Sequence, residues 1–234
     1  MSGKEQSSTL VDGIKRYNWT NIVQSVATSL ESLFGRCHLC GDRIRCGRLC
    51  PGCYDDLPWR CRPWTKNLPS IESVDVCFDF AYPLRQLIHR MKYGGDLAVA
   101  RMLGDIAAQH FVSPATVPGS TTVIFPVPLS RGRFAQRGFN QAVELALPVS
   151  GRLGIDIDEV SIHKPHGLRP QSRLDARLRQ KNARGAFAAK RDVAVGTAIV
   201  FDDVITTGAT ASAMGNILLE AGADRVIVWA LAAA

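Results

Sequence analysis

A short segment near the carboxyl end of the chain carries the residues best suited to chemistry. It reads FDDVITTGAT and follows a strongly apolar run, so two acids lead into a turn rich in hydroxyl groups. The free backbone amides at a helix start bind phosphate dianions, because the helix dipole favours negative charge there. Thr206, Thr207 and Thr210 would add hydroxyl donors, and Gly208 would let the backbone close around the ligand. The segment therefore predicts a phosphate-binding turn.

Two adjacent carboxylates precede this turn. Asp202 and Asp203 stand where a ribose attached to the phosphate would present its 2′ and 3′ hydroxyl groups, and carboxylates accept hydrogen bonds from such diols. The alternative is an ordinary strand-turn-helix with a threonine N-cap. The two acids argue against this alternative, because adjacent carboxylates without a ligand repel each other. The motifs G-x4-G-K-[ST] and G-x-G-x-x-G are absent from the sequence, which disfavours nucleotide hydrolases and dinucleotide folds.

Four of the seven cysteines form a second candidate site. They make two C-x2-C turns, Cys37 with Cys40 and Cys50 with Cys53. Each turn points two thiolates at one place, and two turns supply the four ligands of a tetrahedral zinc ion. Four thiolates close the coordination sphere, so the predicted role of zinc is structural. A reducing compartment disfavours disulfides, and the lack of a βαβ context disfavours a redox C-x-x-C pair.

The other three cysteines lie outside these turns. Cys46 could substitute for Cys50 as a ligand. Cys61 and Cys77 are expected to be free, packed thiols. Arginines around the turns would lower thiol pKa values and help to hold a negative tetrathiolate; these are Arg36, Arg43, Arg45 and Arg48.

The elements that must position these residues follow an α/β pattern from residue 70 onward. Periodicity predicts strands at 74–80, 121–127, 160–164, 197–201 and 225–231. It predicts helices at 84–91, 96–111, 140–153 and 208–221, the third disturbed near Pro148. The basic stretch 165–187 is interpreted as a long loop. A final strand–helix–strand order favours a parallel sheet.

Composition divides the chain into three parts. Residues 1–34 are expected to form a polar tail and an amphipathic helix, and residues 70–234 the α/β domain. Between them, residues 35–68 are rich in Cys, Arg, Gly, Pro and Trp, with no periodicity long enough for a helix or a pair of strands. Such a stretch cannot build a hydrophobic core alone and needs a covalent or metal cross-link.

Composition also limits the class of protein. With 234 residues and 46% hydrophobic positions the chain can bury a core, which excludes wholesale disorder. No apolar run approaches the ~20 residues of a membrane-spanning helix, and the N-terminus lacks a secretory signal, so we expect a cytoplasmic protein. Residues 36–66 hold seven basic against three acidic residues, and 131–191 thirteen against five. These basic fields favour a phosphorylated small molecule or nucleic acid as partner, with solvated surface as the alternative.

Several motifs resemble those of one family. FDDVITTGAT resembles the PRPP-binding motif of type I phosphoribosyltransferases. CHLC and CPGC, followed by YDDLP, resemble the zinc module of the ComF family, which includes competence protein ComF and GntX-like relatives. PVPLSRGRFAQRGFNQA at 126–142 resembles that family's signature. Further matches cover a hood-like segment and a loop: Tyr82, Lys92, Tyr93, Gly94, Gly95, Gln171, Leu174, Arg179, Asn182, Gly185 and Phe187.

The resemblance implies a type I phosphoribosyltransferase fold preceded by a small zinc module with four cysteine ligands. Its core would be a five-stranded parallel sheet between helices, with a small accessory subdomain and a closing loop. By the family's motif, PRPP would be bound by Asp202, Asp203, Val204, Ile205, Thr206, Thr207, Gly208, Ala209 and Thr210. The pyrophosphate loop and its charge would comprise Pro128, Leu129, Ser130, Arg131, Arg133 and Arg137. The closing loop would contain Gln171, Arg173, Arg177, Arg179, Lys181 and Asn182.

Two functions follow from this resemblance. The first is Mg²⁺-dependent transfer of phosphoribosyl from PRPP to an unidentified nucleophile, with release of pyrophosphate through an oxocarbenium-like transition state. The substrate itself would hold most of the Mg²⁺ coordination. The second is an accessory role in DNA uptake, in which the zinc module and basic surface bind single-stranded DNA or a helicase partner. Trp59 and Trp64 beside the arginines favour the second. The sequence assigns no general base, acceptor or oligomeric state.

Overall fold

The structure is a computed structural model that describes residues 35–45, 47–114, 121–165 and 186–234. The amphipathic helix expected within 1–34 and the candidate ligand Cys46 lie outside the described residues. The same holds for the loop residues Gln171, Arg173, Arg177, Arg179, Lys181 and Asn182.

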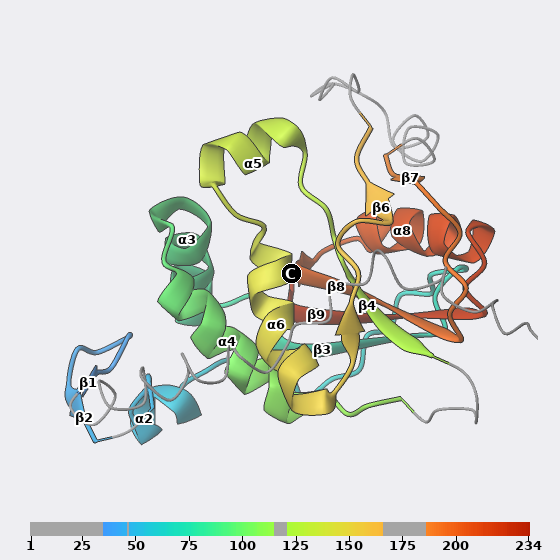
Figure 1. Ribbon diagram of the computed structural model, residues 1–234. Coiled ribbons are helices and arrows are strands. Elements are labelled where there is room, and N and C mark those ends of the chain that lie inside the picture. Colours follow the sequence, from blue (N-terminus) through green and yellow to red (C-terminus); the bar gives the residue numbers. More distant parts are fainter. Residues whose placement is uncertain (1–34, 46, 115–120, 166–185) are drawn as a thin grey trace, which may run out of the picture.

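The described part of the chain alternates helices and strands (Figure 1). The helices are α2 (Pro51–Asp55), α3 (Leu84–Gly94), α4 (Leu97–His110), α5 (Arg131–Arg137), α6 (Gln141–Leu153) and α8 (Ala209–Glu220). The strands are β1 (Gly35–Arg36), β2 (Arg43–Ile44), β3 (Ser73–Asp79), β4 (Thr122–Pro126), β5 (Asp156–Ile157), β6 (Ile162–His163), β7 (Ala188–Ala189), β8 (Thr197–Ile205) and β9 (Arg225–Ala233). None of these helices combines the length and the apolar character that would be needed to span a membrane.

A five-stranded sheet in the order β3-β9-β8-β4-β5 organises the larger part of the molecule. Every neighbouring pair in it is parallel. Successive side chains of β8 point to opposite faces. Ile199 and Phe201 therefore pack with α3, α4 and α6, whereas Ala198 and Val200 pack with α8. The prediction of an α/β fold with a parallel core sheet between helices is confirmed.

Capping residues define several helix ends. The Asp96 carboxylate accepts a hydrogen bond from Val99 N at 3.1 Å, as the sequence predicted for the start of α4. Asn140 caps α6 through Ala142 N at 3.1 Å. The expected disturbance at Pro148 does not end α6, which continues to Leu153. Its proline ring instead packs on α4, where a Cβ on Gly104 would lie 2.8 Å from Pro148 Cγ.

Two predicted strands differ from the structure, and two short elements were not predicted. β8 does not end at residue 201 but continues through both acids to Ile205. The strand expected at 160–164 is the two-residue β6, which pairs with β7 outside the main sheet. The sequence did not indicate β5, which has two residues, or α5, which has no buried side chain. These two short elements lack a periodic apolar pattern, so no local signal marks them.

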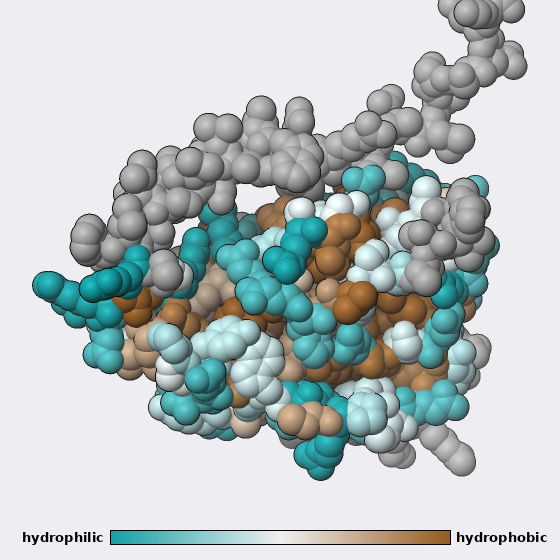
Figure 2. All heavy atoms as spheres, turned by 90° about the horizontal axis from the view of Figure 1, so that it is seen from below, coloured by the Kyte–Doolittle hydropathy of each residue, from teal (hydrophilic) through white to brown (hydrophobic). Residues whose placement is uncertain are grey.

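The four-cysteine module packs against the corner between α3 and α4. Contrary to expectation, it contains a strand pair, β1 with β2, and the helix α2, all too short for periodicity to reveal. Arg90 Nη1 of α3 donates to His38 O at 2.6 Å, and Arg48 Nη1 donates to Ala98 O at 2.7 Å. Arg90 also pairs with Asp96 at 2.7 Å. Figure 2 shows strongly hydrophilic side chains gathered at this end of the molecule.

The thiols outside the two C-x2-C turns are not alike. Cys77 is fully buried in β3, as expected. Cys61 is exposed, so the prediction that it is packed is wrong. Trp59, two residues earlier, packs its ring on Phe78 with centroids 4.6 Å apart. Trp59 therefore makes the apolar contact with β3 in place of Cys61.

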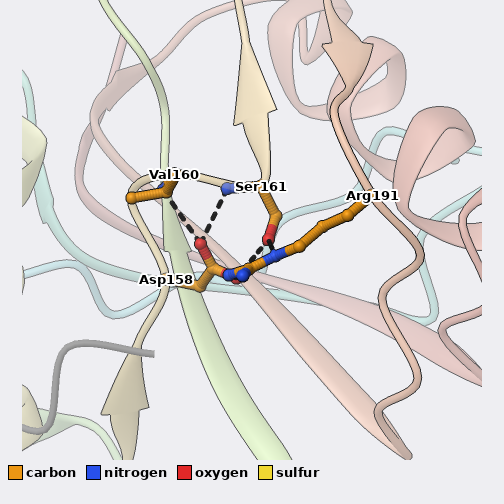
Figure 3. Close-up of polar contacts among 4 residues, drawn as sticks. All are labelled: Asp158, Val160, Ser161 and Arg191. Carbon is orange, nitrogen blue, oxygen red and sulfur yellow. Dashed lines mark hydrogen bonds and ion pairs between the residues drawn. The ribbon is translucent and has the colours of Figure 1, made fainter. Parts of the chain in front are cut away.

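A buried polar network holds the base of the β6–β7 ribbon (Figure 3). The Asp158 carboxylate accepts hydrogen bonds from Val160 N at 2.9 Å, Ser161 N at 2.8 Å and Ser161 Oγ at 2.5 Å. Arg191 Nη2, from the segment after β7, donates to Asp158 Oδ2 at 3.0 Å. Hydrogen bonds lower the pKa of Asp158 although its burial raises it. The network therefore ties the two chain segments that flank residues 166–185.

Candidate functional site

The turn between β8 and α8 forms a small cavity at the carboxyl edge of the sheet. Asp202 and the continuous run 204–211 line this cavity, which has a volume of about 40 Å³. Gly208 is the N-cap of α8 at φ +80°, a conformation that favours glycine. Thr207 Oγ1 accepts a hydrogen bond from Ala209 N at 3.3 Å, and Thr206, Thr207 and Thr210 are exposed. The structure thus brings the predicted hydroxyl donors to one open turn.

The segment between α2 and β3 (residues 56–72), which we call the linker, packs across this turn. Lys66 Nζ donates to Thr206 O at 2.9 Å. Leu68 lies so close that a Cβ on Gly208 would meet its Cδ2 at 2.6 Å. Further along, Ser70 Oγ donates to Ser212 O at 3.2 Å. Gly208 is therefore required both by its backbone angle and by the approach of Leu68, and Lys66 adds a positive charge that the sequence had not indicated.

The two acids differ in their surroundings because they lie at successive positions of β8. Asp203 is only 4% exposed, and its Oδ2 pairs with Lys92 Nζ at 2.5 Å. Asp202 lines the cavity of the turn and accepts a hydrogen bond from Asp203 N at 2.9 Å. Burial, followed by the negative charge of Asp203, raises the pKa of Asp202 well above its ordinary value. Without a ligand, ionisation of both carboxyl groups is therefore unfavourable. A ligand that donates hydrogen bonds to these carboxylates would lower the free-energy cost.

Lys92 belongs to the hood, which we define as residues 80–95. Its position in the matched KYGG motif was the signal for it, but only the fold brings α3 against β8. With a side chain 20% exposed, Lys92 compensates the buried charge of Asp203. Residues of the hood therefore belong to the site of the two acids.

The predicted pyrophosphate loop lies between β4 and α5. Asn140 Nδ2 donates to Val127 O at 3.1 Å and holds the start of this loop. Ser130 is the N-cap of α5, which carries Arg131 and Arg133 exposed to solvent. Arg137 is engaged elsewhere, because its Nη1 donates to Gln141 Oε1 at 2.9 Å. Arg131 and Arg133 are thus the arginines of α5 that are open to an anion.

Lys164 is a cation that sequence analysis missed. It follows β6, and its Nζ lies 5.0 Å from the centroid of the Phe187 ring. Burial, followed by repulsion from Arg133, lowers the pKa of Lys164, and attraction to Asp202 opposes that change. Lys164 therefore interacts electrostatically with both Asp202 and Arg133. The sequence around Lys164 carries no motif that would have indicated this position.

The four cysteines Cys37, Cys40, Cys50 and Cys53 come together as predicted. Their sulfurs all lie within 4.8 Å of one another, and Cys40 Sγ is 3.7 Å from Cys50 Sγ. A tetrahedral ion with Zn–S bonds of about 2.3 Å would separate its sulfurs by about 3.8 Å. Cys37 Sγ accepts a hydrogen bond from Cys50 N at 3.4 Å. Burial raises the pKa of Cys37, but backbone hydrogen bonds outweigh it and lower the value to about 6. The cluster fits a structural zinc ion.

Comparison with known proteins identifies the family. The chain is 31% identical over 206 residues to DNA utilization protein YhgH of Shigella flexneri and of Escherichia coli K12, covering 85% of this chain and 90% of each relative. It belongs to the YhgH/ComF family of competence and DNA utilization proteins. Competence protein F of Haemophilus influenzae is 28% identical over 208 residues, which cover 86% of this chain and 91% of the relative. No family model matches the chain. The resemblance stated from the motifs is confirmed.

Two solved structures also match this member of the YhgH/ComF family. One is the allosteric regulatory enzyme of purine biosynthesis, with 23% identity and a TM-score of 0.36 over 56% of this chain and 25% of that enzyme. The other is a hypoxanthine phosphoribosyltransferase from Staphylococcus aureus, with 9% identity and a TM-score of 0.30 over 57% of this chain and 60% of that enzyme.

Proposed function

We propose that this YhgH/ComF family protein binds PRPP with Mg²⁺ and transfers its phosphoribosyl group to a nucleophile, releasing pyrophosphate. One observation carries the proposal: Asp202 and the hydroxyl-rich turn line a single cavity at the carboxyl edge of the sheet. Ligands of open parallel sheets bind at that edge. The turn amides and threonine hydroxyls would hold the 5-phosphate, and the two acids would hold the ribose diol.

The chemistry would occur at C1 of the ribose. The C1–O bond to pyrophosphate breaks with its electron pair leaving on pyrophosphate, and the nucleophile donates an electron pair to C1. Arg131, Arg133 and Lys164 would meet the charge that develops on the leaving group, which is the way preorganised cations lower such barriers. Mg²⁺, when bound with the substrate, would further neutralise the charge of the pyrophosphate. Arg131, Arg133 and Lys164 would thus stabilise the transition state more than the ground state.

The metals would have separate roles. Among the residues described, the four cysteines are the one group of three or more His, Cys, Asp or Glu side chains placed to hold a metal ion. They would hold a structural zinc ion, which contributes folding energy to the module. Mg²⁺ would be held mostly by the phosphates of the substrate. The protein would act in the cytoplasm, where thiols stay reduced.

Calorimetry with PRPP and Mg²⁺, followed by pyrophosphate release across a panel of amines and nucleobases, tests this function. Asp203→Asn should weaken PRPP binding by tenfold to about a hundredfold, the range for hydrogen bonds that involve a charge. Asp156→Asn is the matched control, because Asp156 is exposed on β5 beside the amino half of β4. Absence of PRPP binding to the unaltered protein, or equal losses in both variants, would contradict the proposal.

Binding of single-stranded DNA is a second candidate function. The names of the relatives, DNA utilization protein and competence protein, support it. So do three exposed aromatic side chains near arginines of the hood and α5: Tyr82 at 73% exposure, Tyr93 at 65% and Phe134 at 51%. Aromatic rings that stack bases, beside cations that meet phosphates, are typical of single-strand binding. Salt-dependent binding of an oligonucleotide that survives Asp203→Asn and is lost in Tyr93→Ala would support this function, and the reverse pattern would exclude it.

A further inference from the structure

A second cavity, larger than the cavity of the phosphate turn, is lined by residues of the hood. Its volume is about 390 Å³, and its lining is formed by Phe80, Arg85, Gln86, Ile88, His89, Lys92 and Tyr93. Arg85, His89 and Lys92 share one face of α3 because they are spaced by four, three and seven residues. No carboxylate stands among these lining residues. The cavity is therefore both aromatic and positive.

The two cavities adjoin the acid pair through different residues. Lys92 lines the hood cavity and its Nζ binds Asp203 Oδ2 at 2.5 Å, whereas Asp202 lines the cavity of the turn. In a ribose 5-phosphate unit, C1 and C4 lie at opposite ends of the C2–C3 diol edge, and the phosphate is carried by C5, the substituent of C4. With the phosphate in the turn and the diol on the acids, C1 would point toward Lys92. The hood cavity is then the space that a group attacking C1 would occupy.

The walls of this cavity indicate the chemistry of its occupant. The rings of His89 and Tyr93 lie 4.7 Å apart between centroids, and the Arg137 guanidinium lies 5.4 Å from the Tyr93 centroid on the α5 side. Tyr93 thus presents a fixed but exposed aromatic surface, on which a flat ring would stack. Arg85 is exposed, and its side chain makes no hydrogen bond or ion pair with another of the described residues. An unpaired guanidinium in such a wall binds carboxylates through paired N–H groups.

We propose that the hood cavity binds the acceptor of the phosphoribosyl group, and that this acceptor is a planar nitrogen heteroaromatic ring bearing a carboxylate. The inference rests on the proposed function, and it names the substrate class for that site. The ring stacks on Tyr93 and the carboxylate pairs with Arg85. The lone pair of a ring nitrogen forms the new bond to C1 while the C1–O electron pair leaves on pyrophosphate, so a pyridine-type nitrogen needs no base to remove a proton.

Matched pairs of small ligands test this inference. Nicotinate and nicotinamide share a ring and differ in charge, as do benzoate and benzamide. Ligand-observed NMR titrations of the full-length, zinc-loaded protein should give about tenfold tighter binding of each acid than of its amide, the ratio expected for one charge-assisted contact. Arg85→Gln should bring that ratio close to one. Tyr93→Ala should weaken acid and amide by the same factor and leave the ratio unchanged.

The control and the contrary outcomes are as follows. Arg152→Gln removes one exposed arginine from the last turn of α6, and it should leave the acid-to-amide ratio as in the unaltered protein. Equal binding of acid and amide, a preference that survives Arg85→Gln, or no binding of any probe would overturn the inference. So would a loss of pyrophosphate affinity in Arg85→Gln with the ratio unchanged, because Arg85 would then serve the leaving group.

The two proposals fail separately. PRPP affinity with Mg²⁺ is measured on the same protein without any ring compound. If PRPP binds and the acids show no preference, the acceptor class is wrong while the proposed function stands. If PRPP does not bind, the proposed function fails, and the ratio in Arg85→Gln still reports whether the cavity selects anionic rings.

Discussion

The phosphate turn and the hood face the same two acids but are held in place by different means. The turn is one continuous segment, fixed by backbone angles at Gly208 and by the packing of Leu68. The hood is held by long charged side chains: Lys92 reaches Asp203, and Arg90 reaches Asp96 and His38 O. Backbone geometry responds little to salt, metal or pH, whereas a few ion pairs respond to each. We therefore expect the turn to be rigid and the hood to be adjustable.

Metal removal should give the largest effect and separate the two regions. A structural zinc ion contributes on the order of 10 kcal/mol to the folding of its module. Without it, the support that His38 O and Arg48 give to α3 and α4 is lost. Hydrogen exchange after chelation should rise in residues 35–62 and in α3, and remain unchanged in the β8–α8 turn. Cys50→Ser should reproduce the pattern, and Cys61→Ser, an exposed thiol outside the cluster, should not. An equal rise of hydrogen exchange in the hood and in the turn would contradict the expected difference between the two regions.

Loss of the ion pair at the junction of the two regions should be the next largest effect. Lys92→Met keeps the length of the side chain but leaves the buried Asp203 carboxylate without its partner. Breaking a buried pair in this way costs about 3 kcal/mol. Urea unfolding at neutral pH measures the loss. Lys190→Met, at an exposed position after β7, is the control and should change stability by less than about 0.5 kcal/mol. A small loss in Lys92→Met would mean that the hood does not depend on this contact.

Adding a methyl group at Gly208 should destabilise the turn directly. Gly208→Ala places a Cβ at φ +80° and 2.6 Å from Leu68 Cδ2. The left-handed backbone costs about 1–2 kcal/mol for an L-residue, and the linker must shift as well. We expect a stability loss of about 2 kcal/mol by thermal unfolding, with weaker PRPP binding and unchanged hydrogen exchange in the hood. Gly132→Ala on α5 meets no neighbour within 4 Å, so it is the matched control.

The sequence predicted the turn more fully than the hood, for a physical reason. The turn is encoded by contiguous residues, and the threonines, Gly208 and Asp202 all meet at one cavity. The four cysteines were equally readable, because two C-x2-C turns fix most of the ligand geometry locally. The parallel sheet followed from alternating strand and helix patterns. Each of these signals acts over a few neighbouring residues.

The contacts that escaped prediction join distant segments. Lys92 meets Asp203, Lys66 meets Thr206 O, and Lys164 lies in the field of Asp202 only because the chain folds. No residue near any of these lysines in the sequence announces its partner. The error in β8 has a similar origin: a run of apolar residues predicts where a strand is buried, but β9 pairs with it as far as Ile205. Pairing with a neighbouring strand, not hydropathy, sets that end.

Asp202→Asn should give the smallest change in stability. The sign of this change tests whether the Asp202 charge destabilises the turn when no ligand is bound. Burial and the adjacent Asp203 charge raise the pKa of Asp202 in the folded protein above the unfolded value near 4. The stability that this carboxyl contributes is therefore present below about pH 4 and is lost as pH rises through the folded pKa. Asparagine cannot ionise, so the variant should match the unaltered protein near pH 4 and exceed its stability by about 1 kcal/mol at pH 8. Thermal unfolding across that range measures the difference, and Asp156→Asn should show none.

Weaker PRPP binding should accompany the gain in stability of Asp202→Asn, because the acid that destabilises the empty turn is one that would hold the ribose. A variant less stable at pH 8 would mean that Asp202 is already compensated without a ligand.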